Sequence, residues 1–156
     1  MNAIVDLTLG SVAEETRERS NLYAFLAAIY RSEVTAELLH QLREPRFRAA
    51  LSAAGVTLDD EFLNRSDDAL LEDLAVEYTR LFVGPGKHIP PYASVHGGKD
   101  GGDLYGRSTA RLRDFIAGAG IAYQSSYKGM ADHICVELEF MTKLTALRAA
   151  AESAGR

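Results

Sequence analysis

Residues 132–151 read DHICVELEFMTKLTALRAAA, and this stretch decides the fold class. As a helix it is apolar around most of its circumference, through Ile134, Val136, Leu138, Phe140, Met141, Leu144 and Leu147. Helices that are apolar nearly all round are central and buried. We therefore expect a central helix here, with the single cysteine, Cys135, as an inert buried thiol inside it.

Helical periodicity also dominates the rest of the chain. The capping-box spacing of Ser11 and Glu14 predicts the start of a helix that ends near Arg31. Its expected apolar stripe is Leu22, Phe25, Leu26 and Ile29. Thr35 is expected to cap a short helix, and Asp67 is expected to cap a longer one that ends at Gly84. Two more helices are expected from Pro45 to Gly55 and from Ser108 to Gly118. No alternating strand pattern is found, so we predict an all-α, single-domain helical bundle over residues 1–156.

One long loop interrupts the helices, from Val83 to Gly106. It holds seven of the 13 glycines and three of the four prolines. Loops of this length usually have a function. Its start, Gly84-Pro85-Gly86-Lys87, lacks the Ser or Thr that follows the Lys of a phosphate loop, and it follows a helix rather than a strand. A helix stop is the favoured interpretation, and a nucleotide-binding or enzymatic protein that uses this loop is the alternative.

Length and charge narrow the function classes. A chain of 156 residues fits one domain. Its 17 basic and 22 acidic residues give a net charge of −5, which argues against nucleic acid or an anionic membrane surface and favours a basic partner. One cysteine excludes an intrachain disulfide. The first ten residues hold no Lys or Arg, and no apolar run reaches membrane-spanning length, so we expect a cytoplasmic protein without membrane insertion.

The polar candidates indicate neither a metal nor a catalytic site. Glu37 and His40 form only half of a di-iron helix motif. His133 and Glu137 lie four residues apart, which is also the spacing of a plain hydrogen-bonded pair. We therefore expect no metal, no cofactor and no catalytic residue.

Two short stretches remain open to two interpretations each. Asp132 can cap the last helix while His133 merely packs, or both can line a pocket for a basic ligand. Tyr92 follows Pro90-Pro91 and is therefore presented from a stiff segment. It can serve as a lid on the core or as a recognition surface for a peptide or a cation.

Four strings of the sequence, in this order, resemble the TorD/DmsD/NarJ family of redox-enzyme maturation chaperones. They are EYTRLFVGPG at 77–86, PPYASVH at 90–96, LYGRST at 104–109 and DHICVELEFM at 132–141. The family usually continues for another couple of helices. The chain is therefore expected to lack the family's last helices, and a homodimer by helix exchange is one way to replace their packing.

The resemblance implies a non-enzymatic, all-helical chaperone. Such chaperones bind the twin-arginine signal peptide and the apo form of a molybdenum- or tungsten-cofactor oxidoreductase, assist cofactor insertion and delay export. Peptide-binding positions of the family map onto Tyr92, Gly106, Asp132 and His133. Because carboxylates pair with guanidinium groups, we add Glu137 to this predicted peptide-binding set.

Overall fold

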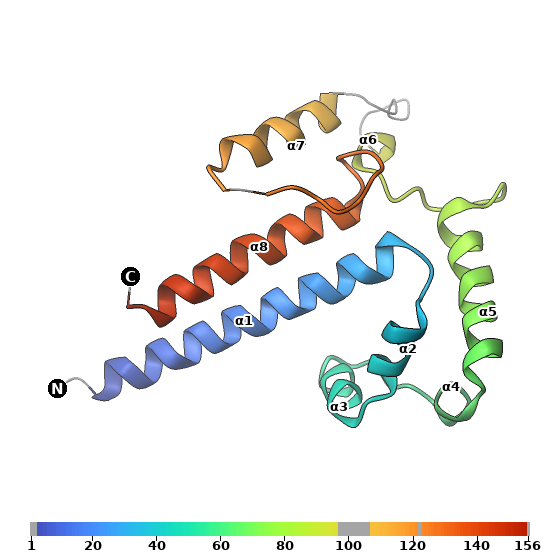
Figure 1. Ribbon diagram of the computed structural model, residues 1–156, viewed down its shortest axis with the longest axis horizontal. Coiled ribbons are helices and arrows are strands. Elements are labelled where there is room, and N and C mark those ends of the chain that lie inside the picture. Colours follow the sequence, from blue (N-terminus) through green and yellow to red (C-terminus); the bar gives the residue numbers. More distant parts are fainter. Residues whose placement is uncertain (1–2, 97–106, 122, 156) are drawn as a thin grey trace. The chain divides into compact units, whose positions relative to one another are not determined.

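The protein is all-α, as predicted, in a computed structural model that describes residues 3–96, 107–121 and 123–155 (Figure 1). Those residues form eight α-helices and one π-helical turn and contain no strand. The chain separates into two compact units. Unit 1 comprises Met1–Arg31 and Pro91–Arg156, and unit 2 comprises Ser32–Pro90. The single-domain organisation and the helix-exchanged dimer stay predictions.

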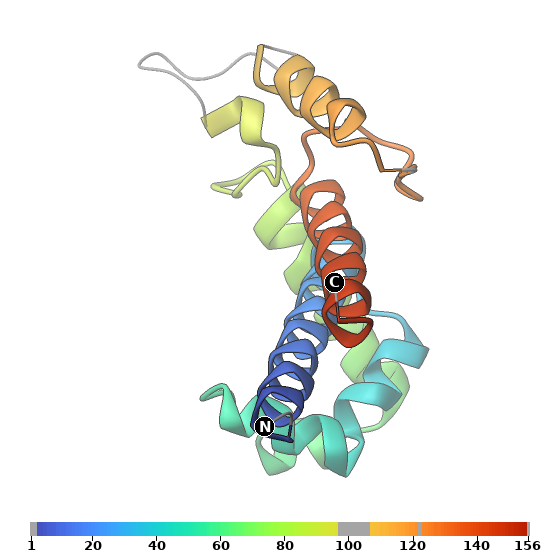
Figure 2. The same cartoon turned by 90° about the vertical axis from the view of Figure 1, so that its left-hand side faces the viewer.

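Unit 1 is built on two long helices, α1 (Ala3–Arg31) and α8 (Ile134–Ser153), which lie side by side and antiparallel (Figures 1 and 2). Among the residues of α1 whose burial is described, 12–31, the buried ones recur every three, four and seven residues and are small: Ala13, Thr16, Ser20 and Ala27. Small side chains let two helix axes approach closely. The predicted stripe is therefore not the main contact face, and its first member, Leu22, is 52% exposed.

The boundaries of these helices differ from the predicted ones. The Ser11–Glu14 capping box is wrong, because the backbone is already helical from Ala3 and polar residues inside a helix cost little. The last helix begins at Ile134, two residues after its predicted start. It is also less buried than predicted, since Leu147 is 44% exposed, although Cys135 is fully buried as expected.

Unit 2 contains short helices joined by tight turns: α2 (Ala36–Arg43), α3 (Pro45–Ala53), α4 (Asp60–Asn64), α5 (Asp67–Tyr78) and the π-helical turn η1 (Thr79–Val83). The predicted Thr35 cap is confirmed, because its hydroxyl accepts from the Leu38 amide. Helix α4 was not predicted. Its N-terminus is capped by the Asp59 carboxylate. Asp67 is not a cap but the first residue of α5.

Buried leucines and one arginine hold unit 2 together. Leu39, Leu42 and Leu70 form its buried apolar centre. The Arg43 guanidinium donates to the carbonyl oxygens of Phe62 and Arg65, at 2.7 Å each, and pairs with Asp67. The single guanidinium of Arg43 thus satisfies carbonyl groups at the end of α4 and a carboxylate at the start of α5.

Candidate functional site

The candidate site lies in unit 1, where residues 91–94 meet the start of α8. A short helix, α6 (Ala93–His96), begins here inside the predicted loop. The Ala93 amide donates to the Asp132 carbonyl at 3.0 Å, and the Ile134 amide donates to the Pro91 carbonyl at 2.9 Å. Between these bonds Tyr92 forms an isolated antiparallel bridge with His133. The backbone therefore brings together three of the predicted site residues: Tyr92, Asp132 and His133.

Asp132 is completely buried and holds α6 rather than α8. Its Oδ2 accepts from the Ser94 amide at 3.0 Å, while its Oδ1 has no hydrogen-bond partner within the described part of the chain. Burial raises the pKa of Asp132, but interactions with Ser94 and with the Thr109 hydroxyl outweigh burial and leave the pKa below its usual value. Asp132 is therefore a buried, ionised anchor for α6.

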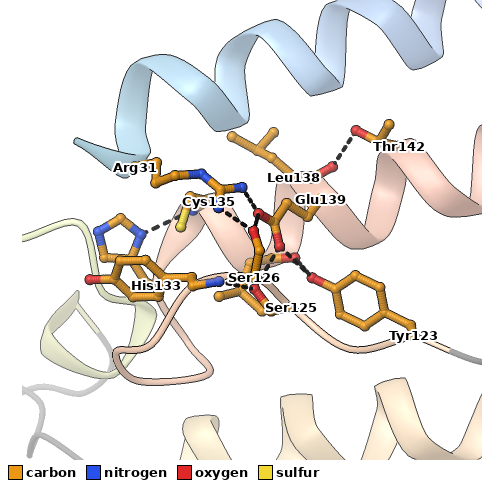
Figure 3. Close-up of polar contacts among 11 residues, drawn as sticks. Arg31, Tyr123, Ser125, Ser126, His133, Cys135, Leu138, Glu139 and Thr142 are labelled. Carbon is orange, nitrogen blue, oxygen red and sulfur yellow. Dashed lines mark hydrogen bonds and ion pairs between the residues drawn. The ribbon is translucent and has the colours of Figure 1, made fainter. Parts of the chain in front are cut away.

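His133, not Asp132, caps the last helix. Its Nδ1 accepts from the Cys135 amide at 3.1 Å, and the residue is 2% exposed (Figure 3). The ring packs edge-on against Tyr92, with 4.9 Å between centroids, and lies 4.5 Å from the ring of Tyr127. Burial lowers the pKa of His133 and outweighs the opposing charge of Asp132, so the ring is neutral at pH 7.

Glu137 lies one helical turn after His133 and has a different environment. Its residue is half-buried, yet within the described part of the chain no hydrogen bond or ion pair reaches its carboxylate. Burial raises the pKa of Glu137, and the negative charge of Asp132 raises it further. The plain His133–Glu137 pair is not formed. Gly106, the remaining predicted site residue, lies outside the described residues.

Glu139, which sequence reasoning missed, gathers the donors that fix the segment between α7 (Arg107–Gly118) and α8 (Figure 3). Its carboxylate accepts from the hydroxyls of Tyr123 at 3.0 Å, Ser125 at 2.6 Å and Ser126 at 3.2 Å. It also pairs with Arg31 at the end of α1. No spacing rule connects residues of an irregular segment to one helix position, so the sequence carries no signal for this cluster.

The other polar candidates are structural. His40 Nε2 lies 3.4 Å from an oxygen of Asp67, and no group of three metal-ligating residues occurs in the described ranges. The Gly84 amide donates to the Thr79 carbonyl at 2.6 Å and ends η1, and a Cβ at Gly84 would lie 3.1 Å from that oxygen. Gly84–Lys87 therefore follows a helix end and does not precede a helix start, where phosphates bind. Over the described residues, no helix is long and apolar enough to span a membrane.

Comparison with known proteins is consistent with this fold. The nitrate reductase delta subunit family model matches residues 36–156. The chaperone protein TorD of Shewanella oneidensis is 32% identical over 141 residues, which cover 81% of this chain and 63% of the relative. TorD of Aliivibrio fischeri is 31% identical over 139 residues, with 81% and 64% covered. The chain thus spans less than two thirds of the length of these relatives.

A solved structure agrees at the level of the fold. It is described as a redox enzyme maturation protein from Archaeoglobus fulgidus. It superposes with a TM-score of 0.53 at 23% identity and covers 88% of this chain and 92% of that one. The curated relatives are both named as chaperone proteins. The chain belongs to the nitrate reductase delta subunit family, the TorD/NarJ type of redox enzyme maturation chaperone.

Proposed function

We propose that this protein is a cytoplasmic chaperone that binds the twin-arginine signal peptide and the apo form of a molybdenum- or tungsten-cofactor oxidoreductase. It assists cofactor insertion and delays export of that client. Family membership and the name of the TorD relatives support the chaperone class. The unpartnered carboxylate of Glu137 is the observation that carries the choice of an arginine-bearing peptide.

Glu137 combines two properties that suit a guanidinium ligand. Its charge is partly withdrawn from water, and no cation within the described residues neutralises it. A guanidinium brings a planar fork of donors that matches a carboxylate, and it also offsets the repulsion between Glu137 and Asp132. A bound arginine therefore stabilises an arrangement that is electrostatically unfavourable without it.

The buried pair next to Glu137 has a positioning role in this proposal. Asp132 and His133 are 0% and 2% exposed, so a peptide does not reach them in this arrangement. They hold Tyr92, which is only partly buried, through the ring contact and the paired backbone. Tyr92 then offers an aromatic face to a cationic or apolar peptide side chain.

Calorimetric titration with a twin-arginine signal peptide tests the proposal, with a Lys-Lys version of the peptide as the control. We expect micromolar or tighter binding of the Arg-Arg peptide, weaker binding of the Lys-Lys peptide, and a loss of affinity at higher salt. Equal affinity for both peptides would exclude recognition of guanidinium geometry. No binding to Arg-Arg peptides from several client classes would contradict the proposed function itself.

A further inference from the structure

A pocket in unit 1 has the opposite charge to Glu137. It is a cavity of about 570 Å³ lined by Tyr92, by Thr109 and Arg113 of α7, and by residues 128–131. This basic pocket, as we name it, lies within the size range of small-ligand sites. Glu137 and Asp132 are not among its lining residues.

Two cations of the basic pocket have no counter-ion among the residues that the structure describes. Arg113 and Lys128 are exposed, and neither forms an ion pair with another described residue. The same is true of Arg107 and Arg111 on the same helix, which makes α7 a basic element in a chain of net charge −5. The acidic residue of α7, Asp114, does not line the pocket. The charge that a ligand meets there is therefore positive.

The pocket wall also carries a buried hydroxyl, Thr109 Oγ1, whose interaction with the Asp132 carboxylate lowers the pKa of Asp132. Thr109 and Arg113 are four residues apart, so their side chains lie on the same face of α7. The hydroxyl of Tyr92, which lines the pocket, lies 3.3 Å from the hydroxyl of Tyr127.

We propose that the basic pocket binds an oxyanion, either a carboxylate or a phosphate. Arg113 and Lys128 bind the charge, because guanidinium and ammonium donors form charge-assisted hydrogen bonds with oxygen anions. This inference goes beyond the proposed function, which concerns a cation at Glu137 and does not require an anion.

The test uses the whole chain at low salt and two kinds of probe. Inorganic phosphate probes the free ion, and two short peptides that differ only in one Glu or Gln probe the carboxylate. Arg113→Gln and Lys128→Gln are the test variants. Arg111→Gln is the matched control, because Arg111 is exposed on the same helix and does not line the pocket. Neither peptide contains arginine, so the outcome is independent of recognition at Glu137.

The proposal expects at least one probe to bind, with about tenfold weaker binding in each pocket variant and unchanged binding in the control. Stronger binding of phosphate than of the Glu peptide identifies a phosphate site, and the reverse identifies a carboxylate site. An equal loss in Arg111→Gln would show diffuse attraction to α7 and overturn the proposal. Failure of phosphate and of the Glu peptide to bind would also overturn it.

Discussion

Glu137 and Glu139 are two residues apart on α8, but their carboxylates differ in the hydrogen-bond donors and cations that surround them. Glu139 is surrounded by three hydroxyl donors and the Arg31 guanidinium. Glu137 has no partner among the described residues, and burial together with Asp132 raises its pKa. A carboxylate that the protein itself satisfies maintains structure, whereas one that it leaves unsatisfied is available to a ligand. The difference separates the scaffold of unit 1 from its candidate binding group.

Replacing Glu139 with Ala is expected to have the largest effect on stability. The change leaves a half-buried guanidinium and several hydroxyls without their common acceptor, which costs about 3 kcal/mol. Thermal unfolding should show Tm lower by roughly 6–12 °C. Glu77→Ala is the control, because its exposed ion pair with Arg80 contributes little. A Tm for Glu139→Ala equal to that of the control would contradict the scaffold role.

Replacing Asp132 with Ala is expected to cost about 1–3 kcal/mol, because the Ser94 amide loses its buried acceptor. Hydrogen exchange at that amide should accelerate, while exchange in the middle of α8 stays slow. The Asp132→Asn variant keeps one acceptor oxygen and should fall between Ala and the wild type. Unchanged protection of Ser94 in the Ala variant would show that Asp132 does not anchor α6.

His133 is expected to make stability depend on pH below neutrality. Its folded pKa lies below the unfolded value of about 6.5, so the unfolded chain takes up the proton first. The neutral ring contributes its full stability above the unfolded pKa, and this contribution is lost as the pH falls from there through the folded pKa. His133→Asn keeps a capping side chain and should flatten the decline in Tm between about pH 7 and pH 5. His88→Asn, at an exposed position, should leave the decline unchanged.

Glu137→Gln is expected to change stability least, and in the opposite direction. The pKa of Glu137 is raised in the folded protein, so the ionised carboxylate lowers the free energy of unfolding at pH values above its folded pKa. This loss of stability disappears as the pH falls through the folded pKa and the carboxylate takes up a proton. Removing the charge should leave Tm unchanged or raise it by no more than about 3 °C. A fall in Tm of the size expected for Glu139→Ala would mean that Glu137 has a structural partner after all.

The fold class followed from the sequence more readily than the site did. The turn residues Pro45, Gly55 and Gly84 and the cap at Thr35 act locally, and their helix ends were predicted. Ser11–Glu14 misled, because a capping pattern does not exclude a preceding helix. Capping preference favoured Asp132 over His133 at α8, but tertiary contact with α6 engages Asp132 and leaves the cap to the histidine.

The family resemblance placed Tyr92, Asp132 and His133 in one site, but their roles depend on burial, which no spacing rule supplies. The same holds for Glu139 and for the basic pocket. Both are assembled from an irregular segment whose hydrogen bonds reach residues far away in the sequence. Local patterns therefore predicted the helices, and long-range polar contacts determined what the site contains.

The most direct test of this account is calorimetric titration of Glu137→Gln with the Arg-Arg peptide at pH 7, beside the wild type and with Tm measured on the same samples. The account predicts an affinity at least about tenfold weaker, with Tm unchanged or slightly higher. Wild-type affinity in this variant would contradict the claim that Glu137 is the carboxylate left open for the ligand.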